Sequence, residues 1–206
     1  MQIDLATSMN LLGVLAFAFT GAMKAINKQL DLLGIFTLGL VTALGGGVIR
    51  DALLTRTPSA FTAFSDIAFA VMGVIAAAAI YNTFKDDLSN SYYIMIPDAI
   101  GLTAFTITGA SVAQQEGILG PGIIFLSVIT AVGGGIIADL LIGRIPSVLK
   151  EDCYATCSIA GGFCFYLTMQ ADIDIAAASF LSSFIILSLR ILAIHGRWSL
   201  PKLTNL

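Results

Sequence analysis

Hydrophobic residues are gathered in seven long stretches along the chain, and short polar segments separate them. A membrane-spanning helix needs about 20 consecutive, mainly apolar residues, and most of these stretches have about that length. The pattern therefore predicts an all-α integral membrane protein with seven transmembrane helices. The expected helices cover Leu5–Ala25, Leu30–Leu54, Phe61–Tyr81, Tyr92–Ala113, Ile118–Ile142, Cys153–Thr168 and Ile175–His195.

The composition agrees with this pattern and narrows the function. Of the 206 residues, 57% are hydrophobic and 11% are charged, whereas soluble proteins have about 25% charged residues. The expected helices use most of residues 1–206, so we expect a single transmembrane domain. The chain has one histidine, and its three cysteines share one face of the sixth stretch, where packing is a simpler role than metal binding. We therefore expect neither an enzyme nor a cofactor, no metal site and no nucleic-acid partner.

The sequence repeats itself with an offset of 88 residues. Residues 10–81 align with residues 98–169 without a gap, and 22 of the 72 pairs are identical. Each repeat contains three expected helices, and this odd number makes the second repeat enter the membrane from the opposite side. We therefore expect two inverted three-helix repeats and an additional seventh helix at residues 175–195, an arrangement known from transporter folds.

The distribution of lysine and arginine predicts the orientation, because cytoplasmic loops of membrane proteins are enriched in these residues. With seven spans, Arg56 lies on one side and all other residues of this kind near span ends lie on the opposite side. We therefore expect the amino terminus outside and the carboxyl terminus in the cytoplasm. The residues on the expected cytoplasmic side are Lys24, Lys28, Lys85, Arg144, Lys150, Arg190, Arg197 and Lys202.

The most informative repeated motif is a run of three glycines inside an apolar stretch, in T-A-L-G-G-G-V-I-R-D at residues 42–51 and T-A-V-G-G-G-I-I-A-D at residues 130–139. Three glycines cost a helix roughly 3 kcal/mol relative to alanine. This cost in both repeats predicts a helix that bends or opens near the middle of the membrane, where transporters and channels expose backbone. The alternative is close helix packing. The glycines are Gly45, Gly46 and Gly47 with Gly133, Gly134 and Gly135.

Polar residues beside the glycines complete the candidate ion pathway. Thr42 and Thr130 precede the glycines, and they either line a polar path or bond to their own helix backbone. Asp51 and Asp139 follow the glycines, and a carboxylate inside a membrane is a functional candidate, although nearby arginines offer structural ion pairs. Arg50 breaks the repeat, because its counterpart is an alanine. A positive charge there opposes the passage of cations unless Asp51 or Asp139 neutralises it.

The two triple-glycine motifs, each followed by an aspartate and then by R-x-P-S at Arg56–Ser59 and Arg144–Ser147, resemble one family closely. The chain looks like a bacterial member of the trimeric intracellular cation (TRIC) channel family. It also resembles the related small bacterial inner-membrane proteins that are often labelled glycine transporters. The resemblance covers nearly the whole chain.

This resemblance implies a homotrimer, embedded in the lipid of the bacterial inner membrane, in which every protomer has its own pore. The pore passes potassium and, less selectively, sodium. It is framed by the second and fifth helices, which are kinked at Gly45–Gly47 and Gly133–Gly135.

Two functions compete on the residues alone. A cation channel uses the paired bends and the carboxylates beside them, since carbonyl oxygens at a bend replace part of the hydration shell of an ion. A secondary carrier for a small zwitterion such as glycine uses the broken helices to hold a carboxylate and an aspartate to hold the ammonium group. The channel is favoured, because no unpaired polar cluster beyond the motif indicates a substrate pocket. A purely structural membrane protein leaves the repeated glycines unexplained.

Overall fold

The computed structural model describes residues 5–83, 92–150, 153–196 and 198, and these residues form nine α-helices. An apolar segment in lipid must satisfy its own backbone hydrogen bonds, which an α-helix does internally. Each predicted stretch corresponds to one long helix, with ends within a few residues of the expected ones. The helices are α1 (Leu5–Asn27), α2 (Leu32–Leu53), α3 (Ser59–Thr62), α4 (Phe64–Thr83), α5 (Tyr92–Gln115), α6 (Gly120–Leu141), α7 (Ser147–Lys150), α8 (Tyr154–Gln170) and α9 (Ile175–Gly196).

Six of the described helices are long and apolar enough to cross a membrane, namely α1, α2, α4, α5, α6 and α9. The sixth predicted stretch forms α8, which has 17 residues and is shorter than a typical span of about 20 residues. The all-α membrane fold is therefore confirmed, and the count of seven spans stays a prediction. Lys85, Arg197, Lys202 and the side chain of Lys150, which entered the orientation argument, lie outside the described residues.

The helix boundaries follow the sequence repeat. Helix α6 begins and ends 88 residues after α2, and the short helix α7 begins 88 residues after α3. These two short helices were not predicted from the hydrophobic pattern, because each is a single turn at the R-x-P-S motif. Both follow a proline, whose missing N–H costs nothing at a helix start.

The turns after the helices repeat as well. Gln29 and Gly117, which follow α1 and α5, have positive φ angles of 55° and 69°. Thr55 and Gly143, which follow α2 and α6, have positive φ angles of 55° and 65°. Each pair is separated by 88 residues, so the same left-handed turn ends corresponding helices whether or not a glycine occupies it.

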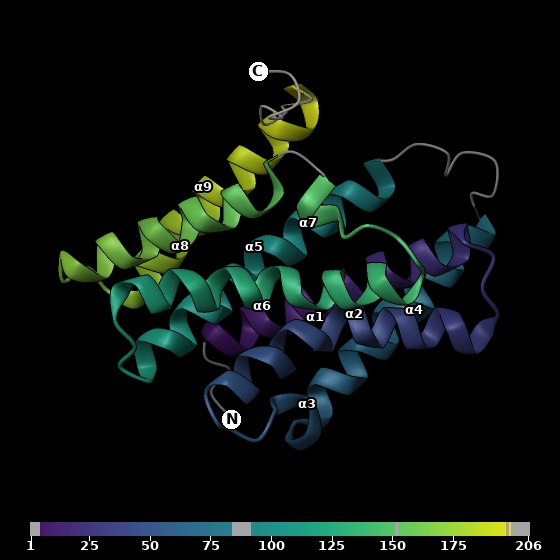
Figure 1. Cartoon of the computed structure of the whole chain (residues 1–206), viewed down its shortest axis with the longest axis horizontal. Helices are drawn as coiled ribbons and strands as arrows, with labels where there is room; N and C mark the ends of the chain where they lie inside the picture. The colour runs from purple at the N-terminus through teal and green to yellow at the C-terminus, as the bar shows by residue number, and fades with distance from the viewer. Residues whose placement is uncertain (1–4, 84–91, 151–152, 197, 199–206) are drawn as a thin grey trace.

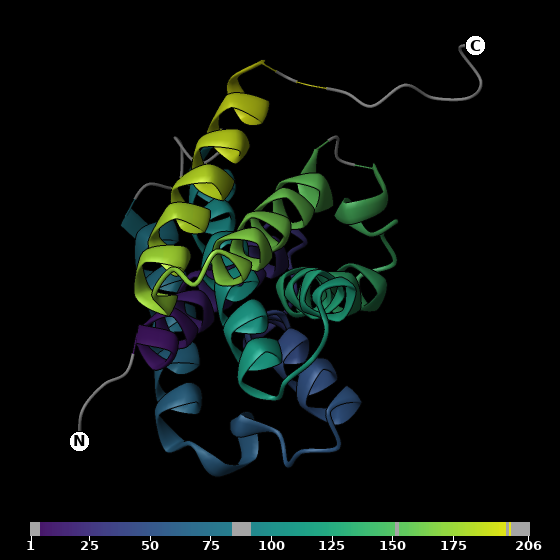
Figure 2. The same cartoon turned by 90° about the vertical axis from the view of Figure 1, so that its left-hand side faces the viewer.

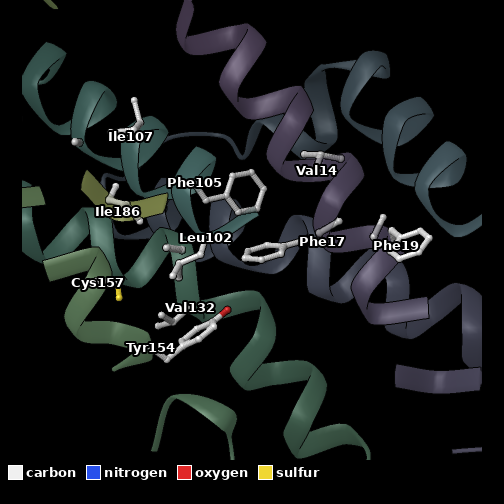
Figure 3. Close-up of a cluster of buried hydrophobic side chains, with 14 of the residues drawn as sticks. Val14, Phe17, Phe19, Leu102, Phe105, Ile107, Val132, Tyr154, Cys157 and Ile186 are labelled. Atoms are coloured by element: carbon white, nitrogen blue, oxygen red, sulfur yellow. The ribbon is translucent and has the colours of Figure 1, made fainter. Parts of the chain in front are cut away.

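The centre of the fold is the crossing of α1 and α5, the two long helices with the most buried side chains. The rings of Phe17 and Phe105 meet edge to face with a centroid separation of 5.2 Å (Figure 3). Gly101 makes room for the ring of Phe17, and Gly13 makes room for that of Phe105. In each contact a glycine of one repeat faces a phenylalanine of the other, and the two contacts are equivalent under the offset of 88 residues.

The remaining long helices surround this pair. Helices α2 and α4 pack against α1, whereas α6, α8 and α9 pack against α5. Helices α8 and α9 lie side by side in both views (Figures 1 and 2). Helix α2 also packs along α6, and this contact brings the two glycine runs together.

Candidate functional site at the crossing of the glycine-rich helices

Helices α2 and α6 run in opposite directions. Ile35, in the first turn of α2, packs in one cluster with Ala138, near the end of α6. Arg56, just after α2, forms an ion pair of 2.9 Å with Glu116, just before α6. The end of each helix therefore lies beside the start of the other, and the glycine runs meet between these ends.

The first two glycines of each run bring the backbones of α2 and α6 into contact. A Cβ atom added at Gly45 would lie 3.1 Å from the Cα atom of Gly134, and one added at Gly133 would lie 3.3 Å from that of Gly46. At Gly46 an added Cβ would collide with the carbonyl oxygen of Thr130, and at Gly134 with that of Thr42. No side chain fits at these middle positions, so close packing explains them.

The third glycine of each run has a different environment. A Cβ atom added at Gly135 would meet nothing within 4 Å, and at Gly47 it would come within 3.9 Å of Nη2 of Arg50. Packing therefore does not require glycine at these two positions. Both helices continue as α-helix through the glycines, and the bend stays a prediction.

The threonine hydroxyls bond within their own helices. Thr42 donates to the carbonyl of Leu38, and Thr130 donates to that of Leu126, both at 2.6 Å. Both threonines are buried. This is the backbone-bonded alternative that the sequence left open.

Asp51, 1% exposed, receives two different donors near the end of α2. Its Oδ1 accepts from Nε of Arg50 at 2.8 Å and lies 2.8 Å from Nη2 of the same residue. Its Oδ2 accepts the backbone N–H of Ser59 at 3.0 Å. Arg50 is also buried, and within the described part of the chain its Nη1 has no hydrogen-bond partner. Arg50 and Asp51 thus form a buried structural ion pair, as the sequence allowed.

Asp139, also 1% exposed, occupies the corresponding position near the end of α6. Its Oδ2 accepts the backbone N–H of Ser147 at 2.7 Å, as Asp51 does from Ser59. Its Oδ1 pairs at 3.2 Å with Nζ of Lys24, which comes from α1. The sequence analysis used Lys24 only as one of the residues that mark the expected cytoplasmic side. Its pairing with Asp139 was missed, because the two residues are 115 positions apart.

A second carboxylate lies near each of these sites. Asp66 of α4 accepts from Nδ2 of Asn10 and from the hydroxyl of Ser59, both at 3.0 Å. In the other repeat, the hydroxyl of Tyr154 donates to Asp98 at 3.2 Å. Asn10 corresponds to Asp98, and Asp66 corresponds to Tyr154, so donor and acceptor have changed places between the repeats. Sequence analysis missed this network, because its members are not identical in the two repeats.

A pocket of about 50 Å³ lies beside Lys24 at the Asp139 end of α6. Its charged lining residues are Lys24, Asp98 and Arg190, and Arg190 lies 3.6 Å from Asp98 and stacks on the ring of Tyr154. A buried water needs about 10–15 Å³ of such volume, so the pocket has room for a few waters. Sequence analysis did not bring these residues together, because they come from separate helices. The lining residues are Lys24, Ile94, Met95, Asp98, Ser147, Tyr154 and Arg190.

The three cysteines are free thiols on α8 and at its start. Within the ranges that the structure describes, no three His, Cys, Asp or Glu side chains are placed to hold a metal ion. The polar chemistry of the site is therefore that of ion pairs, backbone amides and hydroxyls.

Comparison with known proteins places this geometry in a family. A family model described as Glycine transporter matches residues 7–84 and 95–170, two segments whose starts are 88 residues apart. The UPF0126 membrane protein YvgT of Bacillus subtilis is 34% identical over 195 residues, covering 94% of both chains. The UPF0126 inner membrane protein YadS of Escherichia coli is 32% identical over 197 residues, covering 94% of this chain and 93% of that one.

Solved structures share the fold over nearly the whole chain. A TRIC cation channel studied for its conductance superposes with a TM-score of 0.86 at 35% identity, covering 97% of both chains. A prokaryotic TRIC channel crystallised in 0.5 M KCl has a TM-score of 0.86 at 31% identity, covering 95% of this chain and 98% of that one. The TRIC channel orthologue of Rhodobacter sphaeroides has a TM-score of 0.84 at 29% identity, covering 94% and 99%. The chain thus has the TRIC channel fold and is related to the UPF0126 membrane proteins. This protein belongs to the membrane-protein family described as Glycine transporter.

Proposed function

We propose that the protein is a channel for monovalent cations, permeable to potassium and sodium, with one pathway in each protomer. The observation that carries this proposal is the likeness to a TRIC cation channel, with 35% identity and a TM-score of 0.86 over 97% of both chains. A channel passes ions without chemical conversion, so the same likeness supports a protein that is not an enzyme.

The pathway that we propose follows the crossing of α2 and α6. Asp51 and Asp139 lie near opposite ends of this antiparallel pair. Asp51 neutralises the charge of Arg50 at one end, and Asp139 is the carboxylate that attracts a cation at the other. Gly47 and Gly135 leave space beside the helices that packing does not fill. Apolar side chains around the glycines, such as Val48 and Ile136, close a narrow path by excluding water.

We further propose one transmembrane domain built from two inverted three-helix repeats and a seventh helix, with α8 as the short sixth span. The reciprocal contacts support this arrangement. Gly46 meets the Thr130 carbonyl while Gly134 meets the Thr42 carbonyl, and each residue has its counterpart 88 positions away. When each residue is replaced by its counterpart, the two contacts change into each other, as expected of two units related by a two-fold axis. This axis lies in the membrane plane when the repeats are inverted.

The assembly and its location follow from the relatives. The description of the Rhodobacter sphaeroides structure as a trimeric channel supports a homotrimer in contact with membrane lipids. The naming of YadS as an inner membrane protein supports the bacterial inner membrane. The excess of lysine and arginine on one side supports an external amino terminus and a cytoplasmic carboxyl terminus.

Single-channel recording in a planar bilayer with a potassium chloride gradient tests the channel. We expect discrete currents that reverse near the potassium equilibrium potential. Silence from protein shown to be folded and inserted would overturn the proposal. Gly135→Leu tests the pathway, because it adds bulk where nothing lies within 4 Å of a Cβ atom. It should reduce the unitary current while the smaller change Gly135→Ala leaves it close to normal. An unchanged current in Gly135→Leu would put the pathway elsewhere.

The second candidate is a carrier for a small zwitterion such as glycine. Two observations favour it: the description of the family model and the pocket in which Asp98 lies with the cations Lys24 and Arg190. Both charges of a zwitterion find a partner there. Counterflow of labelled glycine into vesicles loaded with unlabelled glycine distinguishes the two functions, since a carrier shows it and a channel does not.

A further inference from the structure

The two ends of the α2–α6 pair hold their carboxylates in the same way but neutralise them differently. Asp51 is paired with Arg50, the preceding residue of the same helix. Asp139 is paired with Lys24, from a different helix. Movement of α1 relative to α6 leaves the Arg50–Asp51 pair intact, whereas it changes the Lys24–Asp139 distance directly.

The Lys24–Asp139 pair is also the weaker of the two by geometry. Arg50 contacts Oδ1 of Asp51 through two nitrogens at 2.8 Å, and its side chain is 4% exposed. Lys24 makes one contact of 3.2 Å, and its side chain is 14% exposed. A lysine ammonium is a point charge on a flexible stem, whereas the guanidinium of arginine is a rigid fork. Lys24 therefore leaves its carboxylate more easily than Arg50 does.

Lys24 has a second acceptor close by. It lines the same pocket as Asp98 of α5, and that pocket has room for water. Asp98 already has partners, since Arg190 lies 3.6 Å from its Oδ2 and the hydroxyl of Tyr154 donates to its Oδ1 at 3.2 Å. A carboxylate offers about four acceptor positions, so an ammonium can join these partners. A movement of the lysine stem within this pocket thus exchanges one carboxylate for another.

We propose that Lys24 is a tethered competitor for the permeating cation at Asp139. In one state its ammonium occupies Oδ1 of Asp139 and keeps a permeating cation from that oxygen. In the other it moves to Asp98, and a monovalent cation takes its place at Asp139. This inference rests on the channel function proposed above and adds to it the residue that sets how strongly the pathway binds its ion.

The dependence of unitary current on potassium concentration tests this competition. Lys24→Met removes the competitor, so the potassium concentration that gives half of the maximal current should fall about fivefold, the range expected for losing a partly exposed ion pair. Lys28→Met is the matched control. It removes the same charge one turn further along the chain, at an exposed position, and should leave the half-saturating concentration unchanged.

Three further variants separate competition from a structural role. Asp98→Asn removes the second acceptor and should shift the half-saturating concentration upward, the opposite direction from Lys24→Met. Lys24→Arg keeps the charge and should not lower it. In an Asp139→Asn background, Lys24→Met should have no further effect, because the contested carboxylate is gone. This double variant also leaves no buried unpaired charge at Asp139, so it can be measured if Lys24→Met fails to fold.

The results distinguish the two proposals. If the wild type conducts and Lys24→Met behaves as Lys28→Met does, the competitor is overturned and the channel stands. If Lys24→Met does not fold, the competitor is overturned by a lack of any upward shift in Asp98→Asn. It is also overturned if Lys24→Met still lowers the half-saturating concentration in the Asp139→Asn background. An equal drop in Lys28→Met attributes the effect to surface charge and also overturns the competitor. A silent wild type overturns the channel and this inference with it.

Discussion

Within each glycine run, the middle glycine allows the backbones of α2 and α6 to pack in contact, whereas the third glycine has open space beside its Cα atom. A methyl group at Gly46 or Gly134 points at a carbonyl oxygen of the opposite helix. We expect Gly46→Ala and Gly134→Ala each to destabilise the fold by about 1–3 kcal/mol, as overpacking does. Loss of the monodisperse size-exclusion peak after stepwise heating in detergent measures this effect.

The third glycines are the matched controls. Gly47→Ala and Gly135→Ala place a methyl group where the nearest heavy atom is 3.9 Å away or beyond 4 Å. Each should be neutral or should stabilise by up to about 1 kcal/mol, because alanine favours helix more than glycine. Equal losses at the middle and third positions would contradict the packing that we describe.

The buried Arg50–Asp51 pair gives a second prediction at this scale. Arg50→Ala leaves the carboxylate of Asp51, 1% exposed, without a cation, and should cost about 3–5 kcal/mol. Adding Asp51→Asn should recover part of the loss, since the buried charge is removed. The exposed pair of Arg56 and Glu116 is the control, and Arg56→Ala should cost no more than about 1 kcal/mol. Chemical unfolding in detergent measures all three, and a loss in Arg50→Ala no larger than in Arg56→Ala would refute the prediction.

At the scale of elements, the two repeats build the same turn from different residues. Thr55 and Gly143 both have positive φ angles, but threonine is a β-branched residue for which this conformation is strained. Thr55→Gly should therefore stabilise the fold by about 1 kcal/mol, and Gly143→Thr should destabilise it by a similar amount. Apparent melting temperatures of the two variants would show opposite shifts, and shifts of the same sign would rule out the equivalence of these turns.

The starts of α2 and α6 also correspond in the repeat but use different residues. Asp31 caps α2 by accepting the backbone N–H of Gly34 at 2.7 Å. Helix α6 has no such cap and instead carries a proline in its first turn. The aspartate side chain accepts a backbone N–H that would otherwise be unpaired. The proline lacks an N–H group, so its helix start has one fewer N–H to satisfy. Corresponding helices thus begin at the same register without sharing the residues that begin them.

At the scale of the whole molecule, inverted repeats place corresponding residues on opposite sides of the membrane. Thr57 and Ile145 correspond at the offset of 88, and both are exposed. In a background with Cys153, Cys157 and Cys164 replaced by alanine, we expect Thr57→Cys to react with a membrane-impermeant maleimide added outside intact cells. Ile145→Cys should react only after the membrane is opened. Labelling of both from outside would exclude the inverted arrangement.

The hydrophobic pattern determined much of this fold by itself. Lipid cannot hydrogen-bond to a backbone, so each apolar stretch had to become a helix, and the long helices lie where the stretches predicted them. The repeat also predicted that α2 and α6 would correspond. The pattern did not predict α3 and α7, because a single helical turn carries no periodicity to detect.

The tertiary structure alone decided which polar groups meet. Lys24 reaches Asp139 from 115 positions away, and Asp98 shares a pocket with it. The sequence marked Asp51 and Asp139 as equivalent, but only packing gave one a partner on its own helix and the other a partner from α1. The reason is physical: backbone hydrogen bonding is local and can be read along the chain, whereas the partner of a buried charge is set by which helices cross beside it.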